Sequence, residues 1–285
     1  MAYAAGDTIE ATHYNGFVAS VNAIWGSGTG DSGYGQSSTL STVAATNTVT
    51  ATQWANLIAR IDSMRQHQSG TTSGLTQPST GDTITYLSAL STQIGTITTN
   101  KRSNNVGVTQ LATANATGAT SWTGNAVREC TFTFSSANAM RYFFNAGGTV
   151  TFNAISSSFS GNTKSANWDA MANAASATVT NAIFWDNLST SNYTLYTGTG
   201  SGADYGSNNL YLQARLNAAP GSSTVITLRG YFVDGAADTV YDLGTDDTVT
   251  GTTRIDAAAN GPTTTYLTNT WGTPTAANNV TVTQS

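Results

Sequence analysis

Three glycines, Gly28, Gly30 and Gly33, have the spacing G-x-G-x-x-G, which in dinucleotide-binding proteins lets a backbone turn hold a pyrophosphate. That chemistry needs a preceding strand, a helix that opens at the glycines and an acidic residue about twenty positions further on. Here the glycines follow a helical pattern, "YGQSSTLSTVAATN" comes next, and Asp62 lies too far along the chain. We therefore interpret "GSGTGDSGYGQ" (residues 26–36) as a turn that ends a helix, anchored by Tyr34 and Gln36.

The chain has few residues of the types that act as acids, bases or nucleophiles, and their positions do not indicate catalysis. The two histidines, His13 and His67, both fall in helical patterns, and a histidine near a helix C-terminus is favoured by the helix dipole alone. The two glutamates are Glu10 and Glu129, and no aspartate stands out as a partner for glycoside hydrolysis. We predict no catalytic residue, no cofactor and no enzymatic activity.

A metal site is not predicted either. Asp242, Asp246 and Asp247 in "DLGTDDT" could hold calcium, since hard cations bind clustered carboxylates, but the stretch lacks the glycine and terminal glutamate of an EF-hand loop. An ordinary solvated turn is the favoured interpretation. The single cysteine, Cys130, lies in the alternating stretch "RECTFTF" and is expected to be buried in a strand. A disulfide within the chain is excluded, and one between chains remains the alternative.

The composition limits the possible partners. Only 9% of the 285 residues are charged, against about 25% in ordinary proteins. The ten lysines and arginines are scattered, the net charge is −5, and no basic stripe indicates nucleic-acid binding. No run of about 18 apolar residues predicts a membrane span. The start "MAYAAGDTIEATHYN" lacks the features of a secretory signal, so we expect synthesis in a cytoplasm and release by another route such as lysis.

The N-terminal part contains an internal repeat, which positions the glycine turn. "DTIEATHYNGFVASVNAI" from Asp7 aligns without gaps with "NTVTATQWANLIARIDSM" from Asn47, at an offset of 40 residues. Each copy predicts a helix with one apolar stripe, with Thr12 and Thr52 as N-caps. Gly26 and Gly70 lie where these helices are expected to stop. A degraded third copy is predicted from "GDTI", which occurs at residues 6–9 and again at 81–84 before a third apolar stripe.

The C-terminal part changes to a period of two residues. "RECTFTF", "GTVTFNAI", "NLYLQARL" and "STVITLRGYFVD" predict strands, with weaker ones at "TVTGTTRID" and "NVTVT". "SANWDAMANAA" from Ser165 predicts a short helix. The fold class is therefore α+β: a module of short amphipathic helices, followed by an antiparallel β-sandwich with one short helix. The expected divisions are residues 1–100, with copies near 7–25, 47–65 and 82–98, a connector at 101–125, and the sandwich at 126–285.

Several motifs, taken together and in order, resemble virion structural proteins of tailed phages, of the type found in marine cyanobacterial myophages. They are the Tyr-Asn helix before "GYGQ", the Trp helix that ends at "HQSG", and "GDTITYLSALSTQIGTITTNKRS". "MRYFFNAGGTVTF" is similar to a "RYFFN-GG" strand pair in that family, and "NWDAM" to the short helix after it. The sequence departs from the family at Trp54-Ala55-Asn56, where Trp-Asn-Asn is usual. The lead "AAGDTIEATHYN" also resembles the start of many tail-fibre proteins.

The resemblance implies a non-enzymatic virion component, assembled in the host cytoplasm and associated with the tail, baseplate, neck or fibre. A capsid decoration protein and a receptor- or glycan-binding fibre protein remain the alternatives. The expected partners are other virion proteins and further copies of the chain, for example in a trimer or hexamer, and a host surface glycan in the fibre alternative. Nucleic acid and membrane insertion are not expected. The residues predicted for the assembly interface are Tyr14, Phe17, Val21, Trp25, Tyr34, Trp54, Leu57 and Ile61.

Overall fold

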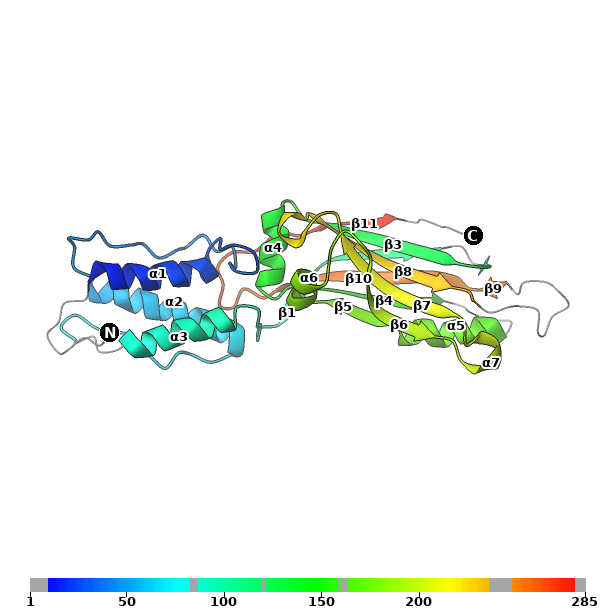
Figure 1. Ribbon diagram of the computed structural model, residues 1–285, viewed down its shortest axis with the longest axis horizontal. Coiled ribbons are helices and arrows are strands. Elements are labelled where there is room, and N and C mark those ends of the chain that lie inside the picture. The colour runs from blue at the N-terminus through cyan, green and yellow to red at the C-terminus, as the bar shows by residue number, and fades with distance from the viewer. Residues whose placement is uncertain are drawn as a thin grey trace. The chain divides into compact units, whose positions relative to one another are not determined.

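The computed structural model describes residues 10–82, 87–118, 121–157, 159, 163–235 and 248–279 (Figure 1). The chain forms two compact units, and the α+β class is confirmed. The helical unit comprises Met1–Thr109, Arg141–Gly147 and Pro262–Trp271, and the β unit comprises Gln110–Met140, Gly148–Gly261 and Gly272–Ser285. Two segments that the sequence analysis placed in the sandwich, 141–147 and 262–271, thus belong to the helical unit.

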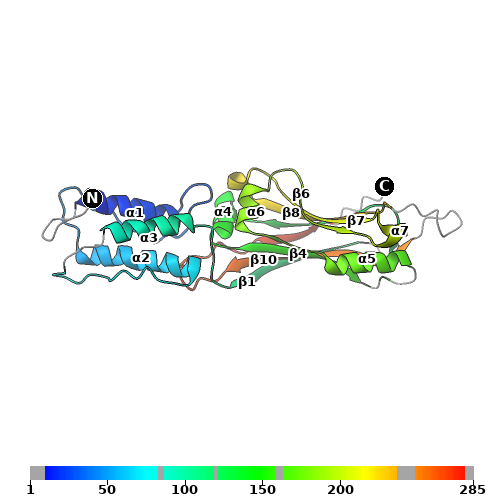
Figure 2. The same ribbon diagram turned by 60° about the horizontal axis from the view of Figure 1, so that its bottom comes forward.

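The helical unit contains α1 (Ala11–Trp25), α2 (Ala51–Ser69) and α3 (Leu87–Thr99), which lie side by side (Figures 1 and 2). Each helix buries the predicted apolar stripe against the other two. Helices of this length are marginal alone in water, so this mutual burial stabilises them. The "GDTI" segments of the first and third copies lie wholly or partly outside the described residues. The buried apolar residues are Tyr14, Val18, Val21, Ile24 and Trp25 in α1, Trp54, Leu57, Ile58, Ile61 and Met64 in α2, and Leu87, Leu90, Ile94 and Ile97 in α3.

The predicted N-caps were wrong, whereas the helix ends were right. The N-cap of α2 is Thr50, not Thr52: the Thr50 hydroxyl accepts from the Gln53 amide, and the Gln53 side chain accepts from the Thr50 amide. This reciprocal pair needs a glutamine three residues after the cap, a condition that Thr52 does not meet. Thr12 lies inside α1, which begins after Glu10 without a side-chain cap. Gly26 and Gly70 are the C-caps, as predicted.

The β unit has the architecture of an antiparallel sandwich. One sheet has the order β1-β10-β4-β5, the other the order β11-β3-β8-β7-β6, and β2 pairs with β9. Side chains alternate in both sheets; in β7, for example, Leu210, Leu212, Ala214 and Leu216 are buried. The strands are β1 (Val108–Thr117), β2 (Ser121–Trp122), β3 (Ala126–Thr133), β4 (Thr149–Ser157), β5 (Ser176–Val179), β6 (Tyr193–Thr199), β7 (Asn209–Leu216), β8 (Val225–Val233), β9 (Val249–Thr250), β10 (Thr252–Pro262) and β11 (Thr275–Asn279).

The predicted helix near Ser165 is confirmed as α5 (Thr163–Ala174), which packs on β4 (Figure 2). Further short helices accompany it: α6 (Asn181–Asp186), α7 (Gly202–Tyr205) and the 3-10 turn η1 (Pro220–Ser222). The stretch 101–125, interpreted as a connector, contains β1 and β2. Most of "NVTVT" lies outside the described residues.

The strand prediction for "MRYFFN" was wrong. These residues belong to helix α4 (Ala137–Asn145), and β4 begins only after the glycines that follow. The Ser136 hydroxyl accepts from the Ala139 amide and so caps the helix. Met140, Phe143 and Phe144 are fully buried, at spacings of three and four residues that suit one helix face. The helical spacing of these residues, and not the resemblance, therefore predicts their structure.

Candidate functional site: a clamped turn and a polar groove in the helical unit

The glycine turn between α1 and the following extended segment requires its glycines. Gly28, Gly30, Gly33 and Gly35 all have positive φ angles, between +47° and +94°. A Cβ atom at Gly33 would lie 2.3 Å from the Ser27 carbonyl oxygen, which is backbone and cannot rotate away. Positive φ and close backbone approach are both conditions that only glycine meets without strain.

Two side chains of α4 hold this turn by its carbonyl groups. The Arg141 guanidinium donates to the carbonyl oxygens of Ser27 at 2.8 Å, Ser32 at 2.9 Å and Gly30 at 3.2 Å. The Asn145 amide donates to Gly30 and Ser32 as well. A phosphate cradle presents backbone N–H groups to an anion. This turn presents carbonyl oxygens to a cation, so its polarity is the reverse of that of a nucleotide site.

The turn carries one carboxylate, and two cations bind it. Lys101 and Arg102, directly after α3, lie 2.6 and 2.8 Å from the Asp31 carboxylate oxygens. Partial burial alone would raise the pKa of Asp31, but the hydrogen bonds from Lys101 and Arg102 outweigh it and hold this pKa below its ordinary value. Asp31 is therefore charged at neutral pH and ties the turn to the end of α3.

Tyr34 and Gln36 anchor the turn, as the sequence indicated. The Gln36 side-chain oxygen accepts from the backbone amides of Thr268 and Asn269, both at 2.7 Å. The Trp271 indole N–H donates to the Tyr34 carbonyl oxygen at 2.8 Å. Segment 262–271 is thus recruited into the helical unit by a turn more than 230 residues away in sequence.

A buried polar cluster lies behind the turn. The Gln68 amide donates to the Tyr34 hydroxyl and to the Ile97 carbonyl oxygen, both at 2.9 Å. His67 stacks edge-on against Tyr34, and its Nε2 lies 3.1 Å from the Ala146 carbonyl oxygen. Burial lowers the pKa of His67 to about 4, although the Ala146 contact opposes this change. His67 is therefore neutral at pH 7 and serves packing.

The extended segment after the turn is clamped along α1 by two asparagines. The Asn22 side chain donates to the Leu40 carbonyl oxygen and accepts from the Leu40 amide, at 2.8 and 2.9 Å. Asn15 makes the same pair of bonds with Val43, both at 2.8 Å. Seven residues of helix span about 10 Å, as do three residues of extended chain, so the two clamps are in register.

The second copy keeps half of this arrangement. Asp62 is the equivalent of Asn22, and its carboxylate accepts from the Ser73 amide at 2.6 Å. Ala55 is the equivalent of Asn15 and has no side chain with which to bind the backbone. The second copy therefore lacks the clamp that Asn15 forms in the first copy.

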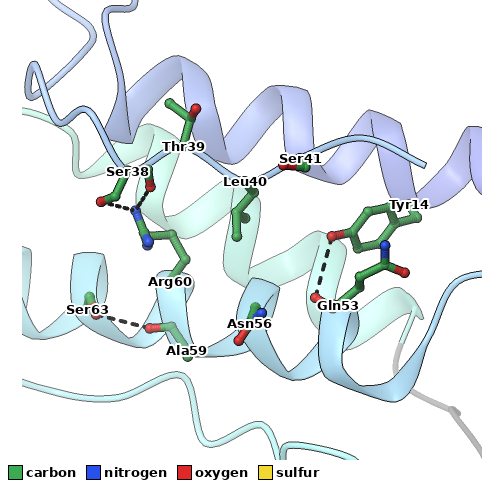
Figure 3. Close-up of a pocket in the computed structure, with 10 residues that line it drawn as sticks. All are labelled: Tyr14, Ser38, Thr39, Leu40, Ser41, Gln53, Asn56, Ala59, Arg60 and Ser63. Atoms are coloured by element: carbon green, nitrogen blue, oxygen red, sulfur yellow. Dashed lines mark hydrogen bonds between the residues drawn. The ribbon is translucent and has the colours of Figure 1, made fainter. Parts of the chain in front are cut away.

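A groove of about 550 Å³ lies between this extended segment and α2 (Figure 3). Arg60 reaches across it: its guanidinium lies 3.8 Å from the centre of the Trp25 ring and donates to the Ser38 carbonyl oxygen. The Tyr14 hydroxyl donates to the Gln53 carbonyl oxygen at 3.4 Å. The lining offers hydroxyls, amides and one cation, and no carboxylate. The lining residues are Tyr14, Ser38, Thr39, Leu40, Ser41, Gln53, Asn56, Ala59, Arg60 and Ser63. It can hydrogen-bond a polar chain but holds no acid–base pair.

Comparisons with protein-family models, curated proteins and solved structures give no significant match.

Seven of the eight residues predicted for the assembly interface lie in the core of the helical unit. Their exposed fractions are 2% or less, so their apolar surface already packs within one chain. These seven are Tyr14, Val21, Trp25, Tyr34, Trp54, Leu57 and Ile61. Phe17 is half-buried, edge-on to Trp54 at 6.2 Å, and keeps part of its ring at the surface. An amphipathic stripe alone does not distinguish a core from an interface.

The other candidates from the sequence are placed as follows. Cys130 is buried, as predicted, and burial raises the pKa of its thiol to about 12. His13 is half-buried beside Glu10, at 3.9 Å. Asp242, Asp246 and Asp247 lie outside the described residues. Within the described part of the chain no cluster of three metal-ligating side chains occurs, and none of its helices is long and apolar enough to cross a membrane.

Sequence reasoning missed Arg141 and Asn145, which hold the turn. Their spacing of four residues places both on one helix face, away from the buried aromatic residues. Reading the segment as helical would have revealed that polar pair.

Proposed function

We propose that this chain is a non-enzymatic structural protein of a tailed-phage virion, associated with the tail, baseplate, neck or fibre. It assembles with copies of itself and with other virion proteins. The motif resemblance suggests the virion, and the use of the polar side chains supports a structural role.

One observation carries the structural role: every lysine and arginine of the chain bonds to the chain's own atoms. A nucleic-acid binder needs cations that face phosphates, whereas these cations bind carbonyl, carboxylate and hydroxyl oxygens of the chain itself. The pairs are Arg60 with Ser38, Arg65 with Thr71, Lys101 and Arg102 with Asp31, Arg128 with Val127 and Thr253, Arg141 with the turn, Lys164 with Asp234, Arg215 with Glu129, Arg229 with Gln213, and Arg254 with Asp256.

The remaining surface suits permanent contacts between subunits. Charged residues make up 9% of the chain, and the cores of stable protein interfaces are depleted of charge. Phe17 in α1 is half-buried and Val108 in β1 is 47% exposed, so both offer apolar surface to a neighbour. Symmetric homo-oligomers are the common outcome for such chains.

Two measurements test the proposal. Infectious particles that encode the chain are purified and their proteins identified by mass spectrometry; the chain is expected at a fixed stoichiometry, and its absence would refute the virion assignment. The purified chain is examined by light scattering after size-exclusion chromatography. A monomer at all concentrations would contradict self-assembly. A particle reconstruction with the chain located distinguishes tail, neck and capsid surface.

A second candidate, glycan binding by a fibre, rests on the outer face of the five-stranded sheet. Tyr211 and Tyr231 are directly opposite each other on β7 and β8, with ring centres 6.2 Å apart. The Arg229 guanidinium lies 4.4 Å from the centre of the Tyr231 ring. Aromatic faces beside planar polar groups can stack on sugar rings. Binding of the purified chain on a glycan array, lost in Tyr211→Ala, would support this candidate, and an array without signal would remove it.

A further inference from the structure

The two lysines of the chain form the same kind of ion pair in two different surroundings. Lys101 Nζ lies 2.6 Å from a carboxylate oxygen of Asp31, and Lys164 Nζ lies 2.7 Å from one of Asp234. The side chains of the first pair are 25% and 24% exposed, whereas those of the second are 0% and 3% exposed. The distances are thus alike, and only the second pair is removed from water.

Hydrogen bonds hold the chain in place on both sides of the buried pair. Lys164 lies in the first turn of α5, where the neighbouring Ser165 hydroxyl accepts from the Thr250 amide at 3.1 Å. Asp234 directly follows β8, and its amide donates to the Asn125 side-chain oxygen at 3.0 Å. The amine and the carboxylate therefore meet in one fixed geometry.

Aromatic rings lie close to both residues along the chain. Trp168 follows Lys164 by one turn of α5, and Phe232 precedes Asp234 by two residues. The Trp122 ring joins them, with its centre 5.0 Å from that of Trp168 and 6.0 Å from that of Phe232. All three rings are at most 2% exposed. Because charges are costly to desolvate, such surroundings favour transfer of a proton from an ammonium to a carboxylate.

We propose that Lys164 and Asp234 become joined by an intramolecular isopeptide bond once the β unit has folded. The ammonium first gives a proton to the carboxylate, and the lone pair of the neutral amine then attacks Cγ. The Nζ–Cγ bond forms, a second proton passes from the nitrogen to the leaving oxygen, and the Cγ–O bond breaks to release one water. An ammonium and a carboxylate thus become an amide and water, with no change in total charge and no co-reactant.

The geometry suits this step. Since a carboxylate C–O bond is about 1.2 Å long, Cγ lies less than about 4 Å from Nζ. Well-oriented groups within one molecule reach effective molarities of about 10⁵ M or more. The amide also removes two buried charges, whereas at Asp31 water solvates both charges and the ion pair persists. The bond ties α5 to the end of β8 within the β unit and does not depend on the proposed virion role.

The test is mass spectrometry of the full purified chain under denaturing conditions. The intact mass should be lower than the sequence mass by one water. Trypsin should leave Lys164 uncut, so that residues 142–215 are recovered covalently linked to residues 230–254, and fragmentation should place the bond at Asp234. Lys101, in the exposed pair, is the internal control and should be cut normally.

Variants separate this bond from other losses of water. Asp234→Ala should have its full sequence mass, and the control Asp256→Asn, at the surface ion pair with Arg254, should keep the loss. If Asp234→Ala does not fold, Asp234→Asn keeps the shape and should form the same amide with release of ammonia instead of water. A folded wild-type chain with its full mass would overturn the proposal. A chain that loses water but is cut after Lys164 would also overturn it, because that result indicates a succinimide at Asp234.

Discussion

Replacing Gly33 by alanine should destabilise the helical unit far more than the same change at the neighbouring Gly30. At Gly33 the φ angle is +94° and the new Cβ atom would lie 2.3 Å from the Ser27 carbonyl oxygen. At Gly30 the φ angle is +55° and a Cβ atom would meet nothing within 4 Å. The two positions therefore separate the cost of the backbone conformation from the cost of the contact.

The magnitude follows from these two terms. A non-glycine residue in the left-handed region costs about 1–2 kcal/mol, which is the whole effect expected at Gly30. At Gly33 the turn must also move, because the clash is with backbone. Moving it breaks one or two hydrogen bonds from the charged Arg141, each worth about 1.5–3 kcal/mol. We expect a total loss of about 3–8 kcal/mol at Gly33.

The assay is urea unfolding of the full chain, followed by the helical circular dichroism signal. Gly16→Ala is the matched control, because Gly16 lies exposed inside α1 with open space around its Cβ position. That substitution should stabilise the helix by about 0.5–1 kcal/mol. If Gly33→Ala costs no more than Gly30→Ala, the close packing of the turn does not matter and our account of these glycines is wrong.

Three further predictions follow from the same unit and from the sheet. Burial lowers the pKa of His67 from its ordinary value of 6.5 to about 4 in the folded chain, so the unfolded state binds the proton more readily. Stability is complete above pH 6.5 and falls by up to about 3 kcal/mol as the pH drops to 4. His67→Gln should flatten this slope in unfolding measurements across the same pH range. Asn22→Ala should cost about 1–3 kcal/mol in urea unfolding, since both polar groups of Leu40 lose their partner, and an unchanged midpoint would show that the clamp is dispensable. Cys130 should resist thiol reagents in the folded chain at pH 8 and react after unfolding, and rapid reaction without denaturant would contradict its burial.

The elements that follow one clear period could be predicted from the sequence. The stripes of α1 and α2 repeat at helical spacing, and β7 alternates without exception, so burial of one face decides each conformation. The Thr50 cap was missed because Thr52 precedes the apolar stripe more closely, whereas the deciding residue, Gln53, lies after the cap. In α4 the strand was expected from the resemblance alone, whereas the spacing of the residues indicates a helix.

The contacts that build the candidate site could not be predicted in the same way, because they join segments distant in sequence. Nothing near Gln36 indicates that Thr268 and Asn269 will bind it, nor that Arg141 will bind the carbonyls of the turn. Arg128 is a different case: alternation with Cys130 and Phe132 already places it on the inward face, and only its charge argued against burial there. The periodicity of a segment predicts which of its apolar residues share a buried face. It does not predict which polar groups from distant segments form hydrogen bonds with each other.

The glycine spacing shows what a motif leaves open. G-x-G-x-x-G specifies where the backbone needs freedom, and both a phosphate cradle and a tight turn need that freedom at the same positions. What separates them is the direction of the peptide groups. In a cradle the N–H groups converge on an anion, whereas here the carbonyls of Ser27, Gly30 and Ser32 converge on the Arg141 guanidinium. A phosphate placed there would meet oxygen atoms and would have to displace the cation's own ligands. The partner of the turn, not the spacing of its glycines, therefore decides the chemistry, and that partner lies more than 100 residues away.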